Sequence, residues 1–288
     1  MTEEVVETTN LPESFRWPDG KRIAVIFRCA FEGWADDKWP GIGPMGNPIK
    51  AGVLDTNAVS FAEYGPKRGI QRILKVADKL DIRLTIMING IMAARHPDIV
   101  KEIHETGHDI VAHSYSMDVV PAYLSEEEER ANIRKAVGAI ETVTGKRPEG
   151  WISPRGTPSL NTGRLLVEEG LKWHGDPLDD DLPYFVNYKS GKLLVFPSNM
   201  DINDLPIYMK HGQTPDAMIK IFDQWLEYVR KYEDGAVRID PTIHSHVFGR
   251  ALGMSAYAKL IEKAKAEDDI WIGTRAEAVS HILTNYAD

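Results

Sequence analysis

The chain has 288 residues, of which 43% are hydrophobic and 27% are charged, and its formal net charge is −9. This composition is typical of a globular protein, and the negative charge argues against nucleic acid or an anionic membrane as a partner. The single cysteine, Cys29, excludes an internal disulfide and is typical of a reducing compartment. No apolar run approaches the ~20 residues that a membrane-spanning helix needs.

The N-terminal residues 1–13 are acidic and polar, and they lack the basic and apolar parts of a secretory signal. We therefore expect a flexible N-terminal arm on a cytoplasmic protein. The first expected strand is "RIAVIF" (22–27), a β-branched run typical of a strand buried on both faces. A connection rich in Trp, Gly and Pro follows it, from Arg28 to Tyr64, and a connection of this length is more often functional than idle.

Strand-like and helix-like segments alternate along the rest of the chain. Ser125 and Glu128 form a capping-box pattern, which predicts a helix that ends near Gly145. The other expected helices are 67–80, 97–107, 161–169, 215–232, 254–266 and 275–284. The other expected strands are 83–88, 108–112, 149–153, 171–175, 192–197, 236–244 and 269–273.

This alternation predicts a mainly parallel sheet, and roughly eight such units predict closure into a barrel. The sequence contains no glycine-rich phosphate loop of the common kinds, so nothing in it supports a nucleotide site. No repeat or linker divides the chain, and we expect one domain over residues 1–288.

In a parallel barrel, functional side chains follow the carboxyl ends of the strands. Several expected strands here deliver an imidazole, a carboxylate or a guanidinium to that rim. Each residue taken alone is as well explained by helix capping or by a loop hydrogen bond, and only their convergence indicates a site. The segments concerned are 28–34, His113, 153–155, 174–184, 201–204 and 244–250.

The motifs "GHDIVAHS", "RPEGWISPRGTPSLNTGRLLVEEG", "DDDLPYF" and "IHSHVFGR" occur in this order. The chain thereby resembles the polysaccharide deacetylase (NodB-homology) family over residues 14–285. Within the family, "EYGPKRGIQRIL" and "DDLPY" are similar to the branch of cofactor-independent allantoinase and cyclic-imide hydrolases. The resemblance implies a distorted (β/α)7 barrel and hydrolysis of a carbon–nitrogen amide bond.

The resemblance also bears on a metal. Family deacetylases bind zinc through one aspartate and two histidines spaced four apart, and a second aspartate is their general base. In this chain Glu32 takes the base position, Gly33 the position of the metal carboxylate, His113 that of the first histidine and Met117 that of the second. Because a zinc site needs about three ligands, and only His113 matches, we expect no metal.

Two alternatives to this metal reading stay open. A second alignment sets Arg28 and Ala30 against the acidic pair of the family, and it also lacks the metal carboxylate. Alternatively Asp118, Asp36 or His246 replaces the missing ligands, which would preserve a zinc-dependent deacetylase.

Glu32 is the expected general base, provided that burial beside Phe31 and Trp34 raises the pKa of its carboxyl group. The alternative is a structural ion pair of Glu32 with Arg28 or Arg155. The resemblance implies that His244 stabilises the intermediate and protonates the leaving nitrogen, a role that suits an imidazole. The alternative is a core histidine paired with a carboxylate.

Arg155 matches an arginine of the allantoinase-like branch and is a further catalytic candidate, since its guanidinium could hold a substrate oxygen or orient Glu32. A solvated surface arginine is the alternative. Asp180 and Asp181 could contact substrate N–H groups or cap a turn, and "GRALGM" leaves the role of Arg250 open. The residues expected to bind substrate are His113, Trp34, Asp180, Asp181, Tyr184 and His246.

Three functions remain in view. The first is a metal-independent hydrolase of a small cyclic amide, such as an imide, a hydantoin or an allantoin-like ureide. The second is a zinc-dependent N-deacetylase of an acetylated sugar or amine with rearranged ligands, and the third is a non-catalytic family member that binds a metabolite. The expected partners are a small-molecule substrate and further copies of the chain, in a homodimer or tetramer, with no nucleic acid and no membrane.

Overall fold

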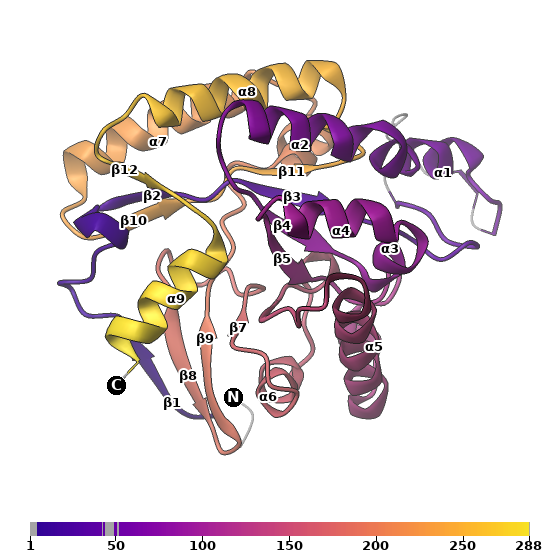
Figure 1. Cartoon of the computed structure of the whole chain (residues 1–288), viewed down its shortest axis with the longest axis horizontal. Helices are drawn as coiled ribbons and strands as arrows, with labels where there is room; N and C mark the ends of the chain where they lie inside the picture. The colour runs from indigo at the N-terminus through magenta and orange to yellow at the C-terminus, as the bar shows by residue number, and fades with distance from the viewer. Residues whose placement is uncertain (1–4, 42, 44–48, 51, 288) are drawn as a thin grey trace.

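The computed structural model describes residues 5–41, 43, 49–50 and 52–287. Parallel strands form a distorted barrel, and helices pack around its outside (Figure 1). The architecture is the predicted distorted (β/α)7 barrel. The barrel strands in chain order are β2 (Ile23–Val25), β3 (Arg28–Phe31), β4 (Thr85–Ile88), β5 (Asp109–Ala112), β6 (Gly150–Trp151), β7 (Trp173–His174), β9 (Gly191–Val195), β10 (Val237–Ile239), β11 (Thr242–His244) and β12 (Ile270–Ile272).

The strands pair in two connected sets. In the larger set the parallel order is β11-β3-β4-β5-β6-β7-β9, and in the smaller set β2 lies between β10 and β12. The two sets are continuous along the chain. β2 of the smaller set runs on into β3 of the larger set, and β10 runs on into β11 in the same way. The functional rim is the end at which β3, β5 and β11 finish.

The helices largely match the predicted ones. Ser125 and Glu128 form the predicted capping box, and Gly145 ends that helix with a φ of 69°, a backbone conformation that glycine adopts without steric cost. The helices are α1 (Thr56–Ala62), α2 (Ile70–Lys79), α3 (Gly90–Arg95), α4 (Pro97–Glu105), α5 (Glu126–Thr144), α6 (Thr162–Glu168), α7 (Ala217–Tyr232), α8 (Ala251–Lys265) and α9 (Arg275–Tyr286), with π-helical turns η2 (Gly65–Gly69) and η5 (Leu205–Lys210) and short 3-10 turns η1 (Pro18–Gly20), η3 (Pro121–Tyr123) and η4 (Pro154–Gly156).

Two predicted strands differ from the observed ones. In place of one strand over 22–27, the chain forms β2 and then β3, and β3 lies at the start of the connection predicted for 28–64. Near the end of that connection the chain forms α1. The strand predicted over 236–244 divides into β10 and β11 at Pro241. Proline has no N–H to donate to a sheet ladder, and the carbonyl of Pro241 instead accepts the N–H of Arg28 at 2.8 Å.

Part of the predicted N-terminal arm is a strand. Residues 5–10 form β1 (Val5–Asn10), which pairs antiparallel with β8 (Tyr184–Tyr188), and β8 in turn pairs antiparallel with β9. The prediction of a flexible arm over 1–13 is therefore wrong for this segment, while residues 1–4 lie outside the described part. The polar, exposed run of β1 offers no apolar alternation to read, since the strand is held by its backbone pairing to β8.

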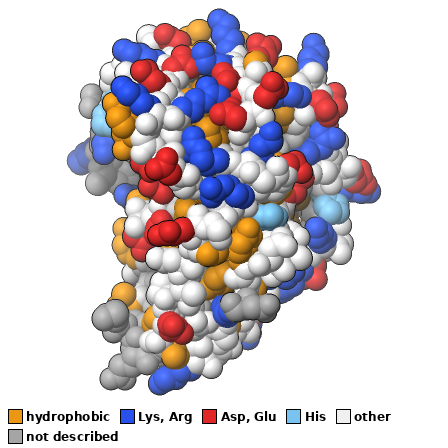
Figure 2. All heavy atoms as spheres, turned by 90° about the vertical axis from the view of Figure 1, so that its left-hand side faces the viewer, with side chains coloured by type: hydrophobic (Ala, Val, Ile, Leu, Met, Phe, Trp, Pro, Cys, Tyr) orange, Lys and Arg blue, Asp and Glu red, His pale blue; other side chains and the backbone are white. Residues whose placement is uncertain are grey.

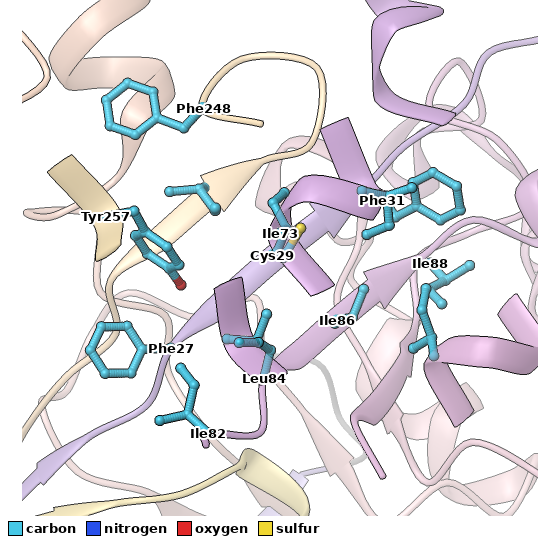
Figure 3. Packing of buried hydrophobic residues seen from close by; sticks show 14 of the residues in the cluster. Phe27, Cys29, Phe31, Ile73, Ile82, Leu84, Ile86, Ile88, Phe248 and Tyr257 are labelled. Carbon is cyan, nitrogen blue, oxygen red and sulfur yellow. The ribbon is translucent and has the colours of Figure 1, made fainter. Parts of the chain in front are cut away.

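Alternate residues of the barrel strands contribute to two apolar layers, as the two-residue period of a strand requires. Cys29 and Ile243 belong to the layer between the strands and the helices, and Figure 3 shows Cys29 and Ile73 of α2 close together in it. Ala30 and Val111 belong to the layer on the opposite face, toward the barrel interior. This alternation decides which strand-end residues point inward.

A buried ionic cluster connects strands that do not pair with each other. Asp240, between β10 and β11, contacts Arg238 and Arg275 and lies 3.7 Å from Nε of Arg28. All four side chains are buried. Arg238 also donates to the carbonyl of Pro197, just after β9, at 2.9 Å. Among the described residues, no strand ladder joins β9 to β10. The arginines of the cluster connect the segment after β9 to β10 instead.

The outer surface carries charges of both signs. On the face seen in Figure 2, basic and acidic side chains are interspersed. Ion pairs such as Arg230 with Asp269 at 2.5 Å and Lys263 with Asp223 at 2.8 Å join neighbouring elements around α7 and α8. Within the described ranges, no helix has the length and apolar character that crossing a bilayer demands.

Candidate active site

Glu32 directly follows β3, on its inward face. Side chains alternate along a strand, so Glu32 continues the inward position of Ala30. In the same way His113, which follows β5, continues that of Val111. His244 is the last residue of β11 and lies opposite Ala30 in the register of β3 and β11. The three functional side chains therefore reach the same rim because parallel strands end together there.

The carboxylate of Glu32 lies among three imidazoles. Its Oε1 is 3.6 Å from Nε2 of His113 and 3.5 Å from Nε2 of His244, and its Oε2 is 4.0 Å from Nδ1 of His246. Each of the four side chains is at most 8% exposed. The structure thus brings together four residues that the sequence nominated from separate segments.

Aromatic side chains hold the ring of His246. The rings of Trp34 and Phe61 each lie 5.6 Å from it, with their planes perpendicular to it. Nδ1 of His246 is buried and makes no hydrogen bond within the described part of the chain. Trp34 and Glu32 also line a cavity of about 90 Å³. Trp34 and His246 therefore lie where the predicted substrate contacts would be made.

Asp204 is the residue of this site that the sequence did not nominate. It precedes η5, and its Oδ1 lies 2.6 Å from Nδ1 of His244. Its Oδ2 accepts the backbone N–H of His244 at 2.8 Å and that of Phe248 at 3.3 Å. The segment 201–204 was noted as a strand end, but only the parallel bridge of Asn203 to Thr242 places it beside β11.

Three of these groups have pKa values shifted by burial and by their neighbours. Burial raises the pKa of Glu32, but the charges and hydrogen bonding of His244, His113 and His246 outweigh it and lower this pKa to about 2. Burial lowers the pKa of His244, but Glu32 and Asp204 outweigh it and raise this pKa to about 9. Burial, aided by the charge of His244, lowers the pKa of His246 to about 4. From the sequence alone, burial is expected to raise the pKa of Glu32. The neighbouring imidazoles outweigh burial, so this pKa falls instead.

The ring of His113 is fixed by the backbone. Its Nδ1 lies 2.5 Å from the carbonyl oxygen of Ile152, which can only accept, so Nδ1 carries a proton. Nε2 is thereby directed at Glu32. A carbonyl at the second nitrogen is the usual device that fixes an imidazole in a functional site.

The zinc triad of the deacetylases does not fit these residues. A Cβ atom on Gly33 would lie 2.3 Å from Sδ of Met92, so a carboxylate at this position requires Met92 to move. Met117, at the position of the second histidine, holds the segment through its N–H, which donates to the carbonyl of Gly33 at 2.9 Å. Across the described ranges, no group of three or more His, Cys, Asp or Glu side chains could hold a metal ion.

Arg155 does not pair with Glu32 in the structure. It is exposed and adopts a φ of 61° in the turn after β6. Arg28 does not pair with Glu32 either, because it lies in the buried cluster of Asp240. Glu32 forms its ion pair with His244, and the alternative of a Glu–Arg pair is wrong.

The other predicted substrate-binding residues lie around a different cavity. Asp180 and Tyr184 line a pocket of about 600 Å³ that Glu32 does not line. The hydroxyl of Tyr184 donates to Asp179 at 2.9 Å, and Oδ1 of Asp180 accepts the N–H of Leu182 at 2.9 Å, which caps the turn. Asp181 is exposed, and only its carbonyl oxygen is engaged, by Arg238 at 3.1 Å.

Comparison with known sequences gives the class of protein. Residues 57–173 match the family model described as polysaccharide deacetylase. The chain is 26% identical to a putative polysaccharide deacetylase of Schizosaccharomyces pombe, over 91% of this chain and 90% of that protein. It is also 26% identical to a peptidoglycan deacetylase of Helicobacter pylori, over 74% of this chain and 84% of that protein.

Solved structures agree. The crystal structure of Puue allantoinase superposes with a TM-score of 0.86 and 28% identity, over 97% of this chain and 96% of that one. A probable polysaccharide deacetylase from Pseudomonas aeruginosa superposes with a TM-score of 0.87 and 26% identity, with the same coverage. Residues 57–173 therefore match a polysaccharide deacetylase domain, and the chain is similar to relatives of that family over most of its length, in agreement with the resemblance of its motifs. Its similarity to an allantoinase agrees with the predicted branch of that family.

Proposed function

We propose that the protein hydrolyses a carbon–nitrogen bond in a small cyclic amide (an imide, a hydantoin or an allantoin-like ureide) without a metal. The enzyme class rests on the relatives, which are named deacetylases and an allantoinase. The narrower substrate class rests on the allantoinase, which covers 97% of this chain. The single observation that carries the proposal is the carboxylate of Glu32 enclosed by His113, His244 and His246.

The charge states provide an ionised proton acceptor beside a protonated donor, with Glu32 a weaker base than a carboxylate of ordinary pKa. With a pKa of about 2, Glu32 is an ionised acceptor at neutral pH, and with a pKa of about 9, His244 is a protonated donor. A buried ion pair of this kind is held together by the low local dielectric. Each partner keeps the other in the protonation state that its role requires.

The reaction then needs only these two groups and water. Glu32 accepts a proton from a water molecule as the water oxygen bonds to the carbonyl carbon. His244 donates its Nε2 proton to the ring nitrogen as the carbon–nitrogen bond breaks, which yields an amide or amine and a carboxylic acid in one opened molecule. The proton on Glu32 returns to His244 across the 3.5 Å that separates Oε1 from Nε2.

Asp204 and His246 act on the same step in different ways. Asp204 orients the imidazole of His244 and stabilises its charge, since it accepts from both the ring and the backbone of that residue. His246 is neutral, and its unpaired Nδ1 is available to a substrate carbonyl or N–H group. The substrate is small in this scheme, because the groups are buried and the cavity at Glu32 has a volume of only about 90 Å³.

A zinc-dependent deacetylase is the competing function. It would need ligands at the positions of Gly33 and Met117, where Met92 blocks one and a thioether occupies the other. The test is turnover of cyclic imides, hydantoins, allantoin and N-acetylated amines by protein purified without chelators, combined with metal analysis. We expect ring opening by metal-free protein. Stoichiometric zinc that is essential for turnover would reject the metal-independent mechanism, and specific binding without turnover of any amide would indicate a non-catalytic protein.

A further inference from the structure

A pocket beside the proposed site is lined by one cation and several aromatic side chains. Its volume is about 560 Å³, and its lining includes Asn57, Phe61, Tyr64, Tyr208, Met209 and Arg250. We call it the Arg250 pocket. No Asp or Glu lines it, so its only formal charge among the described lining residues is that of Arg250.

The Arg250 pocket shares a wall with the proposed site. The ring of Phe61, which lines the pocket, lies 5.6 Å from the ring of His246. On its other side, His246 faces Glu32, with Nδ1 4.0 Å from Oε2. Phe61 and His246 therefore lie between Glu32 and the pocket, and a substrate that reaches both places a substituent alongside this ring contact.

The guanidinium of Arg250 is held in place by the aromatic rings of Tyr64 and Phe61. It lies 4.0 Å from the ring centroid of Tyr64 and 4.8 Å from that of Phe61, and its Nε donates to the carbonyl of His246 at 3.3 Å. Stacking on aromatic rings uses the π-face of a guanidinium and leaves the Nη donors at its edge for a planar acceptor. Arg250 forms no ion pair within the described part of the chain.

A second arginine reinforces the positive field. Nη1 of Arg72 donates to the hydroxyl of Tyr64 at 2.6 Å and to the carbonyl of Gly249. Arg72 also forms no ion pair with a described carboxylate. Two guanidinium groups thus flank Tyr64 without a neutralising carboxylate from the residues that the structure describes, which favours an anionic ligand.

We propose that the Arg250 pocket binds a carboxylate of the substrate, so that the preferred substrate is a cyclic amide with an acidic substituent. A carboxylate matches the paired donors of a guanidinium in geometry and in charge. The proposal deepens the proposed function and rests on it for the catalytic step. It also gives Arg250 a role that its sequence motif left open.

The test compares substrates in pairs that differ in the carboxylate: hydantoin-5-acetate with hydantoin, and dihydroorotate with dihydrouracil. We expect a higher kcat/KM for the acidic member of at least one pair. Arg250→Gln should lower kcat/KM for that member by about 10- to 100-fold, the scale of a lost charge-assisted hydrogen bond, and should lower it by a clearly smaller factor for the neutral member, which loses only the support that Arg250 gives to His246. Arg68→Gln is the matched control, because it removes an exposed charge from the neighbouring turn η2 without touching the pocket.

The outcomes separate the two proposals. Turnover of neutral rings with no preference for the acidic ones, or an equal loss on both members in Arg250→Gln, overturns the carboxylate pocket and leaves the proposed function intact. Failure to hydrolyse any cyclic amide overturns the proposed function. In that case calorimetry with succinate decides on the pocket: binding that is lost in Arg250→Gln supports it, and binding that is absent or unchanged in the variant rejects it.

Discussion

Asp204 and His244 are held together by two hydrogen bonds, one to the imidazole and one to the backbone of His244. Oδ1 of Asp204 lies 2.6 Å from Nδ1 of His244, and Oδ2 accepts the backbone N–H of the same residue at 2.8 Å. The other nitrogen of the ring is left facing Glu32 at 3.5 Å. This arrangement makes His244 a donor with a fixed direction, and it ties the proposed acid to the proposed base.

The first prediction concerns Glu32. Glu32→Gln keeps the shape of the side chain but removes the proton acceptor, so kcat should fall by at least ~100-fold, the usual scale for a positioned general base. Thermal unfolding should show a folded protein with little change in midpoint. Activity comparable to that of the wild type would remove Glu32 from the mechanism.

Met117→His is the control for a concealed zinc site. It restores the second histidine of the family triad, but Gly33 still lacks the carboxylate and has no room for one beside Met92. Two ligands make a poor zinc site, so we expect no stoichiometric zinc by metal analysis and little change in kcat. A gain in zinc affinity accompanied by altered activity would favour the deacetylase instead.

The second prediction concerns Asp204 as a positioning residue. Asp204→Asn keeps an acceptor for the backbone N–H groups but removes the charge, so kcat should fall roughly 10-fold or more. The pKa of His244, about 9 in the wild type, should drop, and the alkaline limb of the pH–kcat profile should move to lower pH. A loss of kcat with an unmoved alkaline limb would show that Asp204 acts only on the fold.

The same substitution should have a pH-dependent effect on stability. The folded-state pKa of His244 is raised above its unfolded value of about 6.5. Its protonation therefore stabilises the native state fully below pH ~6.5, and this contribution is lost as the pH rises through about 9. The melting temperature of Asp204→Asn should lie further below that of the wild type at pH 6 than at pH 10.

The third prediction concerns the ionic cluster. The arginines around Asp240 hold the pKa of its carboxyl group far below the usual range, against burial. Asp240→Asn leaves three buried guanidinium groups without a carboxylate, and it should lower the free energy of unfolding by roughly 3–5 kcal/mol in denaturant titrations. Asp269→Asn, which removes a partner of the more exposed Arg230, should cost less than about 1 kcal/mol. Equal effects of the two substitutions would contradict the role given to the cluster.

The fourth prediction concerns Asp109 at the start of β5. Burial raises its pKa to about 6, although its carboxylate accepts from Thr85 at 3.0 Å and from the N–H of Ala276 at 3.1 Å. Because the folded pKa exceeds the unfolded one, the wild type loses stability as the pH rises from about 4 through 6, and an asparagine does not. The gain in unfolding free energy of Asp109→Asn should be larger at pH 7.5 than at pH 4.5, by on the order of 1 kcal/mol. A difference independent of pH would show that Asp109 ionises freely.

The fifth prediction is the oligomeric state. We expect a homodimer or tetramer by light scattering, with the connection between β3 and α1 in the interface. Ile49, Val53 and Leu54 in this connection are between 46% and 49% exposed and lie within six positions of one another, so an interface here would bury apolar area. Leu54→Asp should shift the assembly toward monomer, and a monomeric wild type would reject the prediction.

Much of this fold can be read locally from the sequence. The alternation of strand-like and helix-like segments and the capping box at Ser125 depend on neighbouring residues, so they predicted the barrel, most of its helices and the rim that Glu32, His113 and His244 reach. Local pattern could not predict β1, because most of its residues are exposed and its position depends on pairing with β8 and on the contact of Val5 with the cluster of Tyr184 and Val186.

Tertiary structure decided the chemistry of the site. The partner of His244 comes from Asp204, forty positions away, and the partners of Asp240 come from three different segments. The pKa of Glu32 was expected to rise on burial, but three imidazoles from other strands lower it. Burial and Coulomb energy depend on distances of a few ångströms between groups that the sequence separates. The sequence by itself therefore determined which residues reach the rim, and only the folded chain determined which of them meet and what charge each one carries.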